Sequence, residues 1–122
     1  RKNLEAIIVD ESYPDDVKVQ AIQLFRKTNC DETRDFFMDI YQNFTQSVEV
    51  RITSYIQVMK CPTYLTIKDI KEFLKTEKVN QVGSFVWSFL TNLLKTSSPL
   101  KIELQALLGK KKLFAKLIFI KT

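Results

Sequence analysis

The fold of this chain is decided by the stretch Val48–Pro62, which reads Val-Glu-Val-Arg-Ile-Thr-Ser-Tyr-Ile-Gln-Val-Met-Lys-Cys-Pro. Its apolar residues recur at helical spacing, and the stretch therefore predicts an amphipathic α-helix. The residues of the predicted inner face are Val48, Ile52, Tyr55, Ile56 and Met59. Ser47 is suited to cap this helix, because a serine oxygen can accept a hydrogen bond from a main-chain N–H of the first turn. Pro62 prevents the helix from continuing, because proline lacks that N–H group.

Similar signals predict helices on both sides of this stretch. Pro14 with Asp15 and Asp16 forms a helix start, because proline suits the first turn and acids face the positive end of the helix dipole. Residues 66–69 have the outline of a capping box and therefore begin another helix at Thr66. The predicted helices cover residues 14–29, 31–44, 47–61, a segment from 66 onward, 77–95 and 98–109. The predicted inner faces of the first two are Val17, Ala21, Leu24 and Phe25, and then Phe36, Phe37, Ile40, Tyr41 and Phe44.

The spacing of these helix starts predicts an all-α fold. Starts near residues 14, 47 and 78 are about 30 residues apart, and stacked pairs of antiparallel helices in an α-solenoid have this spacing. The sequence holds only two glycines and three prolines, too few for the many tight turns of an all-β chain. We therefore expect an α-solenoid fragment over residues 1–108. The basic and apolar tail, residues 109–122, fits either a truncated helix of the next pair or an amphipathic helix at a membrane surface, and we expect the former.

The composition argues against several classes of function. The net charge is +5, but the excess lies in five lysines after residue 109, and residues 1–108 hold fourteen basic and fourteen acidic side chains. The chain therefore lacks the basic face, interleaved with aromatic residues, that binds nucleic acid. It also lacks an apolar run of about 18 residues that could span a bilayer. Because it begins without Met inside an amphipathic segment, we expect a piece of a longer protein.

Few residues carry catalytic chemistry. The sequence contains no histidine, which is the commonest general base and the commonest transition-metal ligand. Motifs for phosphate binding or nucleophilic catalysis are also missing from it. The acidic pairs Asp15/Asp16 and Asp31/Glu32 fall at predicted helix starts, where they stabilise the helix dipole. We therefore expect no enzymatic activity, no catalytic residue, no cofactor and no metal site.

Two stretches together resemble a known family. The Val-Glu-Val-Arg-Ile helix and its Cys-Pro stop are followed by a helix within Lys78–Pro99 that contains Gln-Val-Gly-Ser-Phe-Val-Trp-Ser-Phe-Leu. In this order and separation they resemble the helical domain of the large lipid transfer proteins, which include vitellogenin, apolipophorin, apolipoprotein B and the microsomal triglyceride transfer protein. The resemblance covers roughly residues 12–108 and is nearest to arthropod apolipophorin or vitellogenin.

The resemblance implies a function in lipid transport. It implies that the segment belongs to a superhelical domain of a secreted lipoprotein, where it scaffolds a lipid cavity formed elsewhere in the full protein. Lipids would then be bound by the whole protein, and this segment would contact the remaining domains of the same chain. The alternative is an intracellular HEAT-like scaffold that binds protein partners along a concave surface.

The two cysteines, Cys30 and Cys61, each follow a predicted helix. The residues alone leave open a disulfide between them or two free thiols. The family resemblance implies an oxidising environment and therefore the disulfide. Asn43-Phe44-Thr45 is a formal glycosylation sequon, which makes Asn43 a candidate site. Because Phe44 is predicted to face inward, we expect this sequon to remain unused.

Gly83 is the one glycine inside a predicted helix, where glycine costs about 1 kcal/mol relative to alanine. Either a neighbouring helix or ligand approaches its backbone closely, or the position is an ordinary helix-packing position. We expect the latter.

Overall fold

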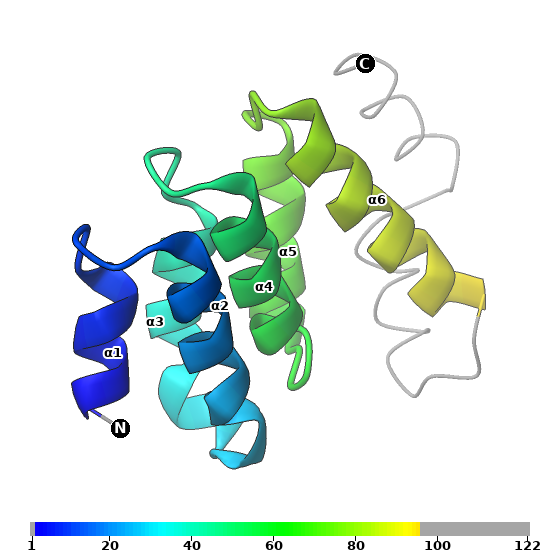
Figure 1. Ribbon diagram of the computed structural model, residues 1–122. Helices are drawn as coiled ribbons and strands as arrows, with labels where there is room; N and C mark the ends of the chain where they lie inside the picture. The colour runs from blue at the N-terminus through cyan, green and yellow to red at the C-terminus, as the bar shows by residue number, and fades with distance from the viewer. Residues whose placement is uncertain (1, 96–122) are drawn as a thin grey trace. The chain divides into compact units, whose positions relative to one another are not determined.

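The computed structural model describes residues 2–95, and these are all-α (Figure 1). They form α1 (Lys2–Val9), α2 (Asp15–Gln23), the 3-10 helix η1 (Leu24–Lys27), α3 (Cys30–Tyr41), α4 (Val48–Val58), α5 (Tyr64–Leu74) and α6 (Asn80–Lys95). The chain divides into two compact units, residues 1–61 and residues 62–122. The helix predicted over residues 98–109 and the tail after it lie outside the described residues. Within the described part, no helix is long and apolar enough to cross a membrane.

The first unit contains α1 to α4, and each of these helices runs antiparallel to the one before it (Figure 1). α4 packs against both α3 and α2, and α2 also packs against α1. Contact between α2 and α4, the first helices of two successive pairs, is the neighbour relation of stacked repeats. The prediction of an all-α, solenoid-like fragment is therefore confirmed.

The predicted start of α2 and the predicted cap of α4 are confirmed, but α2 ends at Gln23 and not near residue 29. Pro14 immediately precedes α2, and two aspartates stand in its first turn. The Ser47 Oγ accepts a hydrogen bond from the Val50 N–H at 3.2 Å, so serine caps α4 as expected. The helix ends at Val58, before Pro62.

The buried face of α4 differs from the predicted one. Its buried residues are Val50, Arg51, Ser54, Tyr55, Gln57 and Val58. Of the predicted face, Ile56 is 37% exposed and Ile52 is half-buried. The physical reason is that α2 and α3 cover α4 from two sides, and that acceptors on the neighbouring elements satisfy the buried Arg51 and Gln57. A polar side chain with such a partner can be buried at little net cost.

Two other predicted core residues of the first unit are exposed. Leu24 is 64% exposed because α2 ends one residue earlier, and the tighter 3-10 helix rotates the following side chains away from the α-helical register. Phe44 is 43% exposed because α3 ends at Tyr41, so the helical spacing does not extend to it. The core instead contains an edge-to-face pair of Phe25 and Phe37, whose ring centroids are 5.1 Å apart.

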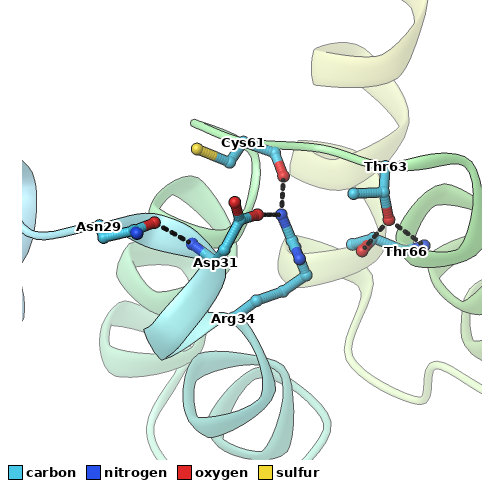
Figure 2. Close-up of polar contacts among 6 residues, drawn as sticks. All are labelled: Asn29, Asp31, Arg34, Cys61, Thr63 and Thr66. Atoms are coloured by element: carbon cyan, nitrogen blue, oxygen red, sulfur yellow. Dashed lines mark hydrogen bonds and ion pairs between the residues drawn. The ribbon is translucent and has the colours of Figure 1, made fainter.

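The second unit contains α5 and α6. The predicted capping box at Thr66 was wrong by three residues, because α5 begins at Tyr64 and Thr63 is its N-cap. The Thr63 Oγ1 accepts a hydrogen bond from the Thr66 N–H at 3.2 Å, and the two hydroxyl oxygens lie 2.8 Å apart (Figure 2). Thr66 thus helps to cap the helix from inside its first turn.

The start of the next helix was also predicted too early. α6 begins at Asn80 and not at Glu77. Glu77 is buried in the turn before it, where its Oε2 accepts a hydrogen bond from the Val79 N–H at 3.2 Å. Val82, Val86 and Leu90 of α6 are fully buried.

Candidate functional site

The side chains of greatest interest in the first unit are three donors that bind main-chain carbonyl oxygens of other elements. The last carbonyls of a helix have no partner within that helix, so another group must satisfy them when they are buried. Arg51 does so for the last residue of α3, whereas Gln57 and Arg34 bind a carbonyl inside η1 and one in the segment after α4. We call these three residues the carbonyl clamp.

Arg51 holds the end of α3. It is 1% exposed, and its Nε donates a hydrogen bond to the Tyr41 carbonyl oxygen at 2.8 Å. Its guanidinium carbon lies 5.9 Å from the centre of the Tyr41 ring and 5.0 Å from that of Phe44. These distances allow cation–π attraction. A buried guanidinium without such partners would be very unfavourable, so the aromatic rings and the carbonyl together explain how α4 buries a charge.

Gln57 binds η1 at Phe25, whose carbonyl oxygen also accepts a hydrogen bond from the Thr28 N–H at 2.9 Å. It is 3% exposed, and its Nε2 donates a hydrogen bond to the Phe25 carbonyl oxygen at 3.1 Å. This bond joins residues 32 positions apart in the sequence. It therefore fixes the position of α4 relative to the segment that follows α2.

Arg34 holds the segment after α4 (Figure 2). Its Nη2 donates a hydrogen bond to the Cys61 carbonyl oxygen at 2.8 Å and pairs with the Asp31 carboxylate in the first turn of α3. The Asn29 side chain caps that turn by accepting a hydrogen bond from the Asp31 N–H at 3.0 Å. The start of α3 and the end of α4 are thereby tied together.

A tyrosine pair lies in the same core. The rings of Tyr41 and Tyr55 have centroids 5.2 Å apart, and both residues are fully buried. Burial, with a smaller contribution from the neighbouring Tyr41, raises the pKa of Tyr55 well above its ordinary value of 10.0. The hydroxyl therefore stays protonated in the folded chain at pH values where an exposed tyrosine ionises.

The predicted site residues are placed as follows. Cys30 is the first residue of α3, and Cys61 follows α4, the helix that packs on α3. The bond between them stays a prediction. Asn43 lies in the loop between α3 and α4, where it is exposed, and the expectation that Phe44 faces inward was wrong.

A surface hollow of about 290 Å³ adjoins that loop. Its lining comes from the end of α1, the turn after it, the outer side of α3 and the loop itself. The lining residues are Val9, Glu11, Phe36, Asp39, Ile40, Asn43, Thr45 and Gln46. Within the described residues, no group of three or more His, Cys, Asp or Glu side chains could hold a metal ion.

With this geometry described, comparison with known proteins gives the family. The family model of the vitellogenin TPR domain matches residues 1–91. The chain belongs to the vitellogenin TPR domain family. The resemblance to the large lipid transfer proteins is therefore confirmed.

Relatives of this TPR domain are found in much longer proteins. Apolipophorins of Locusta migratoria is 31% identical over 118 residues, which cover 93% of this chain and 4% of that protein. Vitellogenin of Penaeus merguiensis is 31% identical over 100 residues, covering 81% of this chain and 4% of that protein. Apolipoprotein B-100 of Rattus norvegicus is 32% identical over 81 residues, which cover 66% of this chain and 2% of that protein. The chain thus spans a few per cent of these relatives' length, and no solved structure matches it.

Sequence reasoning missed the carbonyl clamp of this TPR domain. Arg51 belongs to the Val-Glu-Val-Arg-Ile motif that carried the family resemblance, but a charged residue in an amphipathic helix predicts a solvated face. The available signal was the position of Arg51, three residues after Val48 and four before Tyr55, which places it at the edge of the predicted apolar face. Nothing local in the sequence identifies Gln57 or Arg34 as donors to carbonyls that are 32 and 27 residues away.

Proposed function

We propose that this chain is a scaffold segment of an extracellular lipid carrier, in which it braces a lipid-binding cavity built by other domains of the same protein. The names of the relatives, apolipophorins, vitellogenin and apolipoprotein B-100, support a role in lipid transport. In this proposal the segment has no catalytic role. Its partners are the remaining domains of its own chain, and lipids bind to the full-length protein.

The carbonyl clamp is the observation that carries the scaffold role. Arg51 and Gln57 are the kinds of side chain that could bind a polar ligand, yet both are buried and both bind main-chain carbonyls of their own unit. Arg34 does the same with the Cys61 carbonyl. Side chains used in this way fix the relative positions of helices, which is what a brace must do under load from a neighbouring domain.

A disulfide between Cys30 and Cys61 is part of the proposal. Arg34, one helical turn after Cys30, binds the Cys61 carbonyl oxygen at 2.8 Å, which supports closeness of the start of α3 and the segment after α4. Cys30 and Cys61 are the two cysteines of the sequence. A disulfide fits a secreted protein and is rare in the cytosol. The rival function, an intracellular HEAT-like scaffold, would keep both thiols reduced.

The proposal can be tested in the full-length protein. A photoactivatable diacylglycerol is loaded into the secreted particle and irradiated, and the labelled peptides are identified by mass spectrometry. We expect labelled peptides outside this segment and none from α2, α3 or α4. Dense labelling of those three helices would show that the segment itself lines the lipid site, and the scaffold proposal would fail.

A matched pair of variants tests the bracing role. Arg51→Ala in the full-length protein removes a clamp residue, whereas Lys68→Ala removes an exposed cation from the middle of α5. We expect Arg51→Ala to lower the lipid content of the secreted particle, seen as a higher buoyant density, and Lys68→Ala to leave it unchanged. Equal densities for both variants and the parent would contradict the bracing role.

A further inference from the structure

The loop between α3 and α4 carries the only Asn-x-Ser/Thr sequence among the 122 residues, Asn43-Phe44-Thr45. All three residues are exposed in the structure. The reason for expecting the sequon to stay unused was an inward-facing Phe44, and that reason does not hold, because the residue is 43% exposed. The folded unit therefore leaves all three residues of this glycosylation sequence accessible.

The geometry within the sequon suits attachment of a glycan to Asn43. The Asn43 Oδ1 accepts two hydrogen bonds, from the Thr45 N–H at 2.9 Å and from the Thr45 Oγ1 hydroxyl at 2.6 Å. The amide oxygen is thus engaged by the chain itself. Within the described residues, Nδ2 takes part in no hydrogen bond. The nitrogen that would become glycosylated belongs to an exposed residue.

We infer that Asn43 carries an N-linked oligosaccharide in the mature protein. This inference rests on the proposed extracellular function, because the transfer takes place in the secretory pathway. The donor is a lipid-linked oligosaccharide with an N-acetylglucosamine at its reducing end. A bond forms between the Asn43 Nδ2 and C1 of that sugar, the bond from C1 to the lipid pyrophosphate breaks, and the amide nitrogen loses one proton. The step involves no oxidation or reduction.

The surroundings of Asn43 accommodate the attached sugar. Asn43 and Thr45 stand at the edge of the hollow of about 290 Å³ that adjoins the loop. The hollow offers an aromatic side chain, Phe36, and carboxylates at Glu11 and Asp39. The first sugar residue therefore has room beside the protein, with apolar and hydrogen-bonding groups in reach, and no buried residue has to move.

The neighbouring turn provides an internal control. Asp10 makes the same pair of hydrogen bonds as Asn43, accepting from the Ser12 N–H at 2.9 Å and from the Ser12 Oγ at 2.7 Å. Asp10 and Ser12 are both exposed, and Glu11, which stands between them in the sequence, lines the same hollow. Asp10 cannot be glycosylated, because its side chain lacks the amide nitrogen to which the sugar is attached. The D10N variant would create a second sequon in matched geometry.

The experiment uses the full-length protein, recovered from the medium of cells that secrete it. Glycopeptides covering Asn43 are identified by tandem mass spectrometry, before and after treatment with a peptide N-glycosidase in heavy-oxygen water. We expect a glycan on Asn43 that is lost in Asn43→Gln and in Thr45→Val. It should be retained in Thr45→Ser, which keeps the hydroxyl, and D10N should add a second glycopeptide.

The outcomes separate this inference from the proposed function. Secreted protein whose Asn43 is unmodified overturns the glycosylation site and leaves the extracellular carrier standing. This result is most decisive if D10N is glycosylated in the same cells, because the machinery then reaches this end of the unit. Protein found only in the cytosol, with Cys30 and Cys61 reduced, overturns both.

Discussion

Replacing Arg51 by alanine gives the most direct test of the carbonyl clamp. The side chain is 1% exposed and donates to the Tyr41 carbonyl oxygen at 2.8 Å. Loss of a large buried side chain costs about 3–5 kcal/mol in packing, and a carbonyl left without a partner adds about 1–3 kcal/mol. The variant no longer has to bury the guanidinium charge, and this removes a desolvation penalty of several kcal/mol that partly offsets both losses. We expect a net loss of about 3 kcal/mol for the α3 and α4 pair.

This loss can be measured by hydrogen exchange. A change of about 1.4 kcal/mol alters an equilibrium constant tenfold, so amides of α3 and α4 should exchange about 100-fold faster in Arg51→Ala. Mass spectrometry of the full-length protein reports these peptides without isolating the segment. Arg51→Met keeps the volume of the stem and removes the charge, and we expect it to cost about 1 kcal/mol. The exposed-site control Lys68→Ala should change exchange very little.

The reasoning would be refuted by exchange in Arg51→Ala that stays within about twofold of the parent in both helices, because the buried guanidinium would then contribute no net stability. If Arg51→Met instead matches Arg51→Ala, the lost hydrogen bond and charge would explain the whole effect, and packing of the stem would not contribute.

Three further predictions concern the disulfide, a buried tyrosine and the helical glycine. The proposed Cys30–Cys61 bond closes a loop of about 30 residues and should contribute about 3–4 kcal/mol; Cys30→Ser should lower the melting temperature as much as the double serine variant, and free thiols at both positions in non-reducing peptide maps would contradict it. Burial, and to a smaller extent the neighbouring Tyr41, raises the pKa of Tyr55 above 10.0. As the pH rises, the unfolded chain therefore loses the hydroxyl proton before the folded chain does. The resulting stability is complete below pH about 10 and declines as pH rises further; urea midpoints against pH should show this decline, and Tyr55→Phe should lessen it. At Gly83 an added Cβ would lie 3.6 Å from the Glu77 Cγ and 4.0 Å from the Leu74 Cδ1, which is ordinary contact. Gly83→Ala should therefore stabilise α6 by about 1 kcal/mol, and faster hydrogen exchange in α6 would show that a neighbour needs the space.

Helix identity was predictable from the sequence where a cap and a breaker enclosed an apolar repeat. Ser47 and Pro62 did this for α4, and Pro14 did it for the start of α2. The start of α5 was misplaced because Thr63 and Thr66 are both capable of capping, and local sequence does not decide between two hydroxyls whose oxygens end up 2.8 Å apart. Phe44 was misplaced because helical spacing was continued past the end of α3.

The buried face of α4 was not predictable from periodicity. A hydrophobic stripe assumes that only apolar residues become buried, and Arg51 and Gln57 do not obey that assumption. Their burial depends on acceptors at Tyr41 and Phe25, which come close only once the helices are packed. Tertiary structure therefore decided the face. The family was nevertheless recognisable, because the motif that includes Arg51 is local in sequence.

The carbonyl clamp also bears on how much sequence change the domain can absorb. Every amino acid contributes the same main-chain oxygen, so the hydrogen bonds of Arg51, Gln57 and Arg34 make no demand on which residue type accepts them. The hydrogen bonds therefore constrain the residue type at the three donor positions, while Tyr41 and Phe25 are constrained by the contacts of their side chains. In a saturation-mutagenesis library, the donor positions should accept fewer replacements than the acceptor positions, which should accept other apolar residues of similar volume. Domains of this kind can then diverge widely in composition and still hold the same helix arrangement.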